Sequence, residues 1–159
     1  MKRWNGWGSE NSSMALPASA DVFLEQVIGK GVKLADVSLQ QAITQVPASK
    51  LSSDAHPLIS TDAEVRLRHA RGQSLPDFLA MRSGDIDAYP DGVCFPENRQ
   101  QVKELLAFAK TSKIKLIPYG GGTSVAGHIN PKKPNETNTD TPVVTMDMTK
   151  MNQLMSLDE

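Results

Sequence analysis

The sequence contains one cysteine, few aromatic residues and almost no net charge. Because Cys94 has no second cysteine to pair with, an intramolecular disulfide is excluded and a reducing compartment such as the cytoplasm is expected. A formal net charge of −1 argues against the basic surface with which proteins bind nucleic acid. No stretch approaches the roughly 20 apolar residues of a membrane-spanning helix, and no apolar segment typical of a signal peptide follows Lys2 and Arg3. We therefore expect a soluble cytoplasmic protein without a transmembrane segment.

The residue types that bind metals are also sparse. His56, His69 and His128 lie far apart in the sequence and share no ligand spacing with Cys94, so we predict no metal site. Cys94 itself lies in a short apolar run, where a free cysteine usually behaves as a small buried hydrophobe. Metal-dependent chemistry is accordingly not expected of this chain.

The pattern of residues changes near position 87. Residues 1–87 hold four segments in which apolar residues recur at helical spacing, each near a Ser or Thr that can cap a helix. Residues 88–159 instead hold short apolar strands and a single helix, the pattern of an α/β domain. We expect the four helices of the first part at about 19–28, 38–46, 61–72 and 74–84.

The second part predicts a compact βαβ unit. Val93–Phe95 reads as a short apolar strand, a helix follows over 98–111, and a second strand runs through Ile114–Tyr119. Val143–Met148 alternates as a further strand, and the stretch 132–142, rich in Pro, Asn and Thr, is expected to be a flexible loop. The expected fold class is α+β or α/β, with a helical region followed by a small βαβ sheet.

Three consecutive glycines follow the second strand and are succeeded by two hydroxyl side chains. Glycines in a row leave the backbone free of Cβ atoms, so several N–H groups can turn toward one bound anion. The hydroxyls add short, adjustable donors. Such a loop suits the diphosphate of a dinucleotide, although a plain glycine-rich turn is the alternative. The candidate cofactor-binding residues are Pro118, Tyr119, Gly120, Gly121, Gly122, Thr123 and Ser124.

Two common phosphate loops do not fit this spacing. A P-loop requires a Lys followed by Ser or Thr after the last glycine, and no Lys lies between Tyr119 and Pro131. A Rossmann fingerprint requires a third glycine where this chain has Val125, and it requires a helix to begin there. The loop is therefore expected to hold an anion through backbone N–H groups without help from a helix.

The order strand, helix, strand and glycine loop resembles the first FAD-binding subdomain of the vanillyl-alcohol-oxidase, or p-cresol methylhydroxylase (PCMH), type of flavoenzyme. Arg3–Gly8, Arg66–Leu75 and Leu79–Gly84, together with Pro90–Gly127, look like the alkylglycerone-phosphate synthase branch of that family and its bacterial members. The resemblance covers nearly the whole chain and is most specific over 66–127.

This resemblance implies FAD as cofactor, with its diphosphate on the glycine loop and Tyr119 beside the adenine or ribose. It implies noncovalent binding, because related flavoproteins that attach flavin through a histidine carry it inside the loop, where this chain has Thr123, and His128 lies outside. In this branch FAD acts without net redox change while a fatty alcohol replaces the acyl chain of acyl-dihydroxyacetone phosphate. A lipid-linked substrate, an ether-lipid product and a homodimer are implied in the same way.

The resemblance also implies that the chain is an amino-terminal fragment whose catalytic residues, unknown from this sequence, follow residue 159. Two alternatives stay open. One is an FAD-linked oxidase or dehydrogenase of a 2-hydroxy acid. The other is a truncated, noncatalytic piece that needs a partner chain to complete the flavin site.

Two groups outside the loop invite a choice between structural and binding roles. Arg66, Arg68, His69 and Arg71 are expected to form a basic, solvated helix face with ion pairs, in preference to a phosphate site. Trp4 and Trp7 are expected to fold back onto the parent domain and bury area there.

Overall fold

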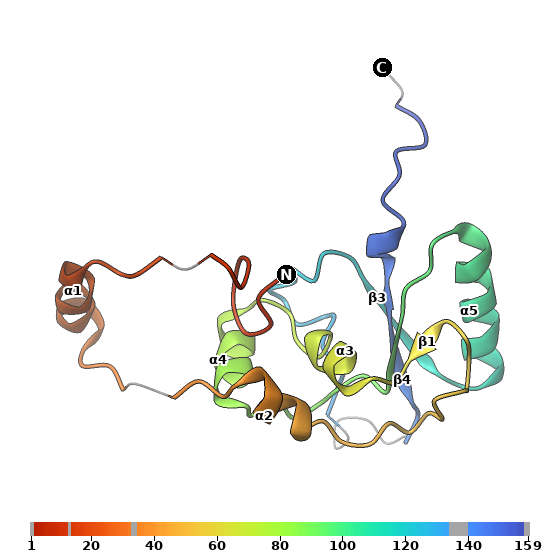
Figure 1. Cartoon of the computed structure of the whole chain (residues 1–159), viewed down its shortest axis with the longest axis horizontal. Helices are drawn as coiled ribbons and strands as arrows, with labels where there is room; N and C mark the ends of the chain where they lie inside the picture. The colour runs from red at the N-terminus through yellow and green to blue at the C-terminus, as the bar shows by residue number, and fades with distance from the viewer. Residues whose placement is uncertain (1, 13, 33–34, 134–139, 158–159) are drawn as a thin grey trace.

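The computed structural model describes residues 2–12, 14–32, 35–133 and 140–157. Part of the loop expected at 132–142 thus lies outside the described residues. Figure 1 shows a sheet flanked by α5, a group of short helices beside it, and α1 held away from both on extended segments. In chain order the elements are α1 (Ala18–Ile28), α2 (Leu39–Thr44), β1 (Ile59–Ser60), α3 (Ala63–Arg68), α4 (Leu75–Ser83), β2 (Gly92–Cys94), α5 (Arg99–Thr111), β3 (Lys115–Tyr119), β4 (Val143–Asp147) and the 3₁₀ helix η2 (Met148–Lys150).

The sheet has the strand order β1-β2-β4-β3, so β4, the last strand in sequence, lies between β2 and β3 (Figure 1). β2 and β3 both pair with β4 in parallel, which places Val93 and Ile117 on either side of Thr145. The antiparallel β1 closes the other side of β2. The predicted α/β unit is confirmed, whereas β1 is only two residues long and carries no sequence signal of its own. The parallel strands end at one edge, where open α/β sheets bind ligands.

Helix α5 covers one face of the sheet because its apolar residues fall on one side. Leu105 and Ala109 are buried against Cys94, Val144 and Met146 of the two inner strands. The Asn98 side chain accepts a hydrogen bond from the Gln101 amide and so begins the helix. This packing fixes the strand-to-loop transition after β3 relative to the rest of the sheet. Burial of the Cys94 thiol in apolar surroundings raises its pKa to about 12, which fits a structural cysteine.

A second apolar cluster joins α2, α3 and α4. Its buried members include Leu67, Phe78 and Met81. Ser38 and Ser74 cap α2 and α4 as the sequence predicts, each in a reciprocal capping box. The division of the chain near residue 87 stays a prediction, since each apolar cluster contains residues from both sides of that position.

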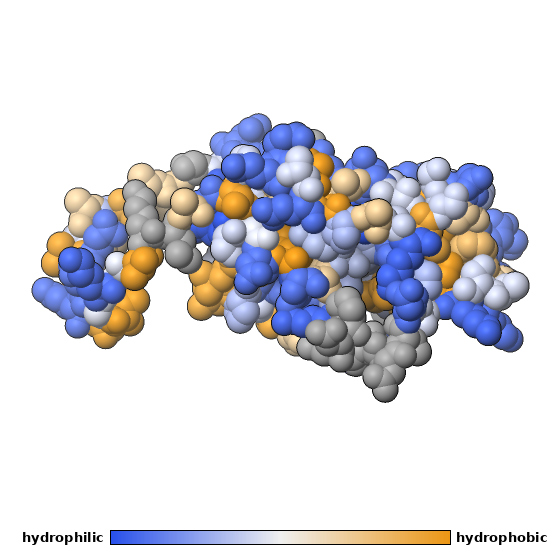
Figure 2. Space-filling model, turned by 90° about the horizontal axis from the view of Figure 1, so that it is seen from below, coloured by the Kyte–Doolittle hydropathy of each residue, from blue (hydrophilic) through white to orange (hydrophobic). Residues whose placement is uncertain are grey.

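Helix α1 is the exception to this packing. It begins at Ala18 after Pro17, without the side-chain cap that Ser19 was expected to provide, because the extended Pro17 already ends the preceding segment. None of its residues is buried. Figure 2 shows the apolar side chains that α1 leaves on the surface, and Phe23, Val27 and Ile28 are all more than half exposed. Among the described residues, no helix is long and apolar enough to cross a membrane.

The structure overturns the expectation that Arg66 lies on a solvated face. Its residue is 3% exposed, its Nε donates to the Pro90 carbonyl at 2.7 Å, and its Nη1 donates to the Pro47 carbonyl at 2.8 Å. α3 ends at Arg68 and packs against α2 and β2. The side of the helix that carries Arg66 therefore faces inward, toward the carbonyls of Pro47 and Pro90. Arg68 and Arg71 do form the expected ion pairs, with Glu64 and with Asp87 respectively.

Candidate functional site

The glycine loop leaves β3 at the edge where the parallel strands end. Within the described residues, none of the amides of Gly120, Gly121 and Gly122 donates a backbone or side-chain hydrogen bond. Space at Gly120 is open, while Gly122 has a φ of +70°. Because strong donors are rarely left without acceptors in a folded chain, these amides are suited to an external anion. No helix begins directly after the loop over residues 123–133, as the sequence predicts.

Contacts with the helical part hold the loop in place. The Gln73 amide donates to the Ser124 carbonyl at 2.7 Å, and the Gly72 amide donates to Asn130 Oδ1 at 2.8 Å. Asn130 Nδ2 in turn donates to Asp77 Oδ1 at 2.7 Å. A Cβ atom at Gly72 would overlap the Ser124 carbonyl oxygen, so only glycine permits this close approach. Asp77 therefore caps α4 and, through Asn130, positions the glycine loop.

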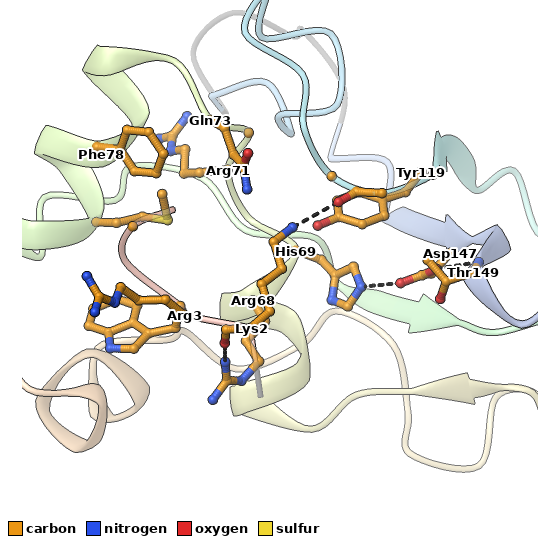
Figure 3. A pocket seen from close by; sticks show the side chains of 17 residues that line it. Lys2, Arg3, Arg68, His69, Arg71, Gln73, Phe78, Tyr119, Asp147 and Thr149 are labelled. Carbon is orange, nitrogen blue, oxygen red and sulfur yellow. Dashed lines mark hydrogen bonds and ion pairs between the residues drawn. The ribbon is translucent and has the colours of Figure 1, made fainter. Parts of the chain in front are cut away.

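A cleft of about 200 Å³ opens in front of the loop (Figure 3). Its walls come from the amino-terminal residues, the connection between α3 and α4, the glycine loop and the end of β4. The lining residues are Lys2, Arg3, Trp4, Gly6, Arg68, His69, Arg71, Gly72, Gln73, Phe78, Met81, Tyr119, Gly120, Gly121, Gly122, Asp147 and Thr149.

Four of the predicted site residues, Tyr119 and the three glycines, lie in this cleft, whereas Pro118, Thr123 and Ser124 do not line it. Pro118 and Thr123 are exposed beside it. The Ser124 hydroxyl lies 3.0 Å from His128 Nδ1. That the loop binds the cofactor stays a prediction, but three of its expected members are directed elsewhere in this structure.

The lining is rich in positive charge. Lys2, Arg3, Arg68 and Arg71 face the cleft, and Asp147 is its single carboxylate among the described lining residues. Arg71 Nε is buried without a hydrogen-bond partner in the described part of the chain. Glu64 and Asp87 lie outside the lining and neutralise Arg68 and Arg71 in part, but the remaining positive charge and the unpaired donors still favour an anion such as a diphosphate. The donor set therefore fits the diphosphate of a dinucleotide. Sequence reasoning found the arginines but not their convergence on the glycines.

Asp147, at the end of β4, is bonded to His69 across the floor of the cleft (Figure 3). His69 Nε2 lies 2.8 Å from Asp147 Oδ2, and Nδ1 lies 2.7 Å from the Val65 carbonyl oxygen. Burial opposes ionisation of Asp147, but hydrogen bonds from His69 and Thr149 hold the pKa of this carboxyl below its ordinary value. Both ring nitrogens of His69 are thus engaged, one by Asp147 and the other by the Val65 carbonyl. The pair links α3 to β4 and has no spare basic nitrogen.

Replacing Asp147 by asparagine is expected to destabilise the fold in a pH-dependent manner. A carboxyl with a lowered folded-state pKa stabilises the native state above its ordinary pKa of about 4, and this contribution is lost as the pH falls through the folded-state value. The difference in free energy of unfolding between the parent and D147N should therefore be clear at pH 5 and vanish in stronger acid. Urea titrations at both pH values measure it. An equal difference at both would contradict the ionised pair.

Tyr119 acts as a wall of the cleft. Its ring centroid lies 4.7 Å from that of His69, and the residue is 7% exposed. Burial, helped by the charge of Asp147, raises the pKa of the phenol to about 12, so it stays neutral. Its hydroxyl occupies the space in which a side chain at Gly122 would stand. Packing of Tyr119 thus explains why the loop needs a glycine at position 122.

Comparison with known proteins identifies the class to which this site belongs. Residues 90–159 match a family model described as an FAD binding domain. Protein Rv2250A of Mycobacterium tuberculosis is 30% identical over 106 residues, which are 59% of this chain and 68% of that protein. The chain belongs to this family of FAD-binding proteins.

Particular relatives narrow the resemblance. Alkyldihydroxyacetonephosphate synthase of Trypanosoma brucei brucei is 33% identical over 100 residues, which are 63% of this chain and 16% of the synthase. A mitochondrial D-lactate dehydrogenase [cytochrome] of Arabidopsis thaliana is 32% identical over 87 residues, 53% of this chain and 14% of the dehydrogenase. A solved alkyldihydroxyacetonephosphate synthase superposes with a TM-score of 0.77 at 22% identity, covering 99% of this chain and 34% of that one. This superposition establishes a shared fold, and the chain spans about a third or less of each of these three proteins.

Proposed function

We propose that this chain binds FAD noncovalently and holds the FAD diphosphate on the amides of Gly120, Gly121 and Gly122. The observation that carries the proposal is the set of three consecutive amides that find no acceptor among the described residues, in a loop that lines a cleft with basic side chains. Membership of an FAD-binding family supplies the identity of the cofactor. The hydroxyls of Thr123 and Ser124 adjoin the amides and would need to turn inward to join them.

The nucleophiles of the chain support noncovalent binding. His69 is committed at both ring nitrogens, and Cys94 is buried with a raised pKa. His128 is exposed, does not line the cleft, and lies 3.0 Å from the Ser124 hydroxyl. The third histidine, His56, packs on the Phe108 ring at 4.8 Å, beside α5. None of these side chains is placed to form a bond to a flavin in the cleft.

We further propose that the whole protein is an alkyldihydroxyacetonephosphate-synthase-like flavoenzyme of the cytoplasm that acts on a lipid-linked substrate as a homodimer. The relatives with that name share more of this chain than the dehydrogenases do, 63% against 53%. The bound flavin would supply the electron-accepting chemistry. The residues described here would bind its diphosphate, orient it through the fixed loop and leave the chemical step to other parts of the enzyme.

Titration of the purified chain with FAD, followed by quenching of flavin fluorescence, tests the binding proposal. We expect micromolar binding of FAD and much weaker binding of FMN, because FMN lacks the diphosphate. NAD carries the same adenosine diphosphate as FAD and is tested in parallel as a competitor for bound FAD. Circular dichroism establishes that the sample is folded. A folded sample that binds none of the three would overturn the claim that these residues hold FAD on their own.

A second candidate is an FAD-linked dehydrogenase of a 2-hydroxy acid, which the similarity to D-lactate dehydrogenase favours. The two activities differ in what they do to the flavin. Anaerobic addition of D-lactate to the whole protein would bleach the flavin absorbance in a dehydrogenase. An alkyldihydroxyacetonephosphate-synthase-like enzyme would keep its oxidised spectrum with D-lactate.

A further inference from the structure

The opening segment of the chain, residues 2–12, folds against the glycine loop. A bridge between Lys2 and Ser9 and a hydrogen bond from the Arg3 amide to the Gly8 carbonyl at 3.0 Å bend the segment back on itself. Trp7 stacks edge-on against Phe78 of α4, with ring centroids 4.8 Å apart. Trp4 packs against the second apolar cluster as expected, whereas Trp7 is 69% exposed and does not bury the area expected of it. The segment therefore has a defined position at the rim of the cleft.

Lys2 is directed from this segment to the centre of the loop. Its Nζ donates to the Gly121 carbonyl at 2.9 Å, and its own carbonyl accepts from Arg68 Nη1 at 3.2 Å (Figure 3). The ammonium group thus lies within one hydrogen bond of the peptide that joins Gly121 to Gly122. Lys2 and the three glycines line the same cleft, so an anion bound there lies within reach of the lysine side chain once it rotates from the carbonyl.

The charge of Lys2 is poorly compensated. Its hydrogen-bond partner is a neutral carbonyl, and no ion pair joins it to a carboxylate within residues 2–12, 14–32, 35–133 and 140–157. Partial burial lowers the pKa of Lys2, and the charge of Asp147 opposes this shift only in part. Asp147 is itself engaged by His69 and Thr149. A bound anion would provide the countercharge that the protein does not.

We propose that the ammonium group of Lys2 is a direct ligand of the bound diphosphate. The anion site is then composite. Its donors come from residue 2 and from residues 120–122, which are far apart in the sequence. This inference rests on the proposed FAD binding and adds a residue that the glycine motif does not contain. Rotation of the lysine side chain from the Gly121 carbonyl to a phosphate oxygen exchanges a neutral acceptor for a charged one, which is a stronger hydrogen bond.

The test uses the full chain with Lys2→Gln, Lys2→Arg and, as matched control, Lys30→Gln, since Lys30 lies exposed after α1 and outside the cleft. FAD affinity is measured by fluorescence quenching, and bound FAD is then displaced with ADP or with adenosine. We expect K2Q to bind FAD and ADP about ten-fold or more weakly, since hydrogen bonds to charged groups contribute about 1.5–3 kcal/mol. K2R should retain most of the affinity, and K30Q should match the parent.

Adenosine separates direct contact from a structural role. If Lys2 touches the diphosphate, K2Q weakens displacement by ADP and leaves displacement by adenosine unchanged. Equal weakening of both competitors would mean that Lys2 only holds the opening segment, and it would overturn the inference. Parent-like ADP binding by K2Q would overturn it as well, while FAD binding by the parent would leave the proposed function standing. A parent chain that is folded but does not bind FAD would overturn both.

Discussion

Replacing Gly122 by alanine is expected to abolish measurable FAD binding. The new Cβ atom would overlap the hydroxyl of Tyr119, and the φ of +70° at this position is strained for any L residue other than glycine. Tyr119 cannot retreat easily, because it is buried against His69. The loop must therefore shift, and the amides of Gly120, Gly121 and Gly122 move from their positions in the cleft. Fluorescence titration should show that the affinity for FAD falls by about a hundred-fold or more, which is the size of effect expected when binding groups are displaced by about 1 Å.

Gly120→Ala is the matched control for that experiment. A Cβ atom at Gly120 meets no other atom within 4 Å, and the backbone conformation there is accessible to alanine. Its effect on FAD affinity should be at least ten-fold smaller than that of G122A. Thermal unfolding of both variants separates loop distortion from global unfolding. Parent-like FAD binding by G122A would show that the amides of this loop do not hold the diphosphate.

Replacing Arg66 by methionine is expected to cause the largest loss of stability. Methionine fills a similar volume but leaves the carbonyls of Pro47 and Pro90 without their donor. The Pro90 carbonyl is buried, and a buried polar group that loses its partner costs about 1–3 kcal/mol, whereas Pro47 is exposed and water can replace the lost donor. We therefore expect a loss of about 1–3 kcal/mol in the free energy of unfolding. Chemical denaturation monitored by circular dichroism measures this change.

Arg99→Met provides the comparison for Arg66. Arg99 lies exposed at the start of α5, and its substitution should change the free energy of unfolding by less than about 0.5 kcal/mol. If R66M were as stable as R99M, the buried hydrogen bonds of Arg66 would not contribute to the fold. If R66M were destabilised but bound FAD with parent affinity under native conditions, Arg66 would be confirmed as a structural residue.

The elements of this protein that depend on local sequence could be predicted. Capping serines at 38 and 74, the apolar side of α5 and the strand before the glycines all act within a few residues. Local patterns do not report what an element packs against, and this explains the error at Arg66. The carbonyls that bury its guanidinium belong to residues 19 and 24 positions away. β1 is similarly invisible, because two residues are too few to show a period.

The candidate site follows the same division. The glycine loop is a contiguous motif, so its role as a diphosphate loop could be proposed from the sequence. The other walls of the cleft could not, because His69 and Asp147 are 78 positions apart and Lys2 lies 119 positions from Gly121. The sequence also suggested that the hydroxyls of Thr123 and Ser124 face the anion. In the structure the Gln73 amide donates to the Ser124 carbonyl, and neither Thr123 nor Ser124 lines the cleft.

The central position of β4 has a consequence for how the chain acquires its structure. β2 and β3 do not pair with each other, and each has β4 as a parallel neighbour. During synthesis, both strands leave the ribosome well before Val143–Asp147, and until then they expose unsatisfied backbone edges. Pairing over this sequence separation is slow, and nascent chains in that state are prone to aggregate. The interval before β4 emerges is therefore the period in which this protein most needs a chaperone.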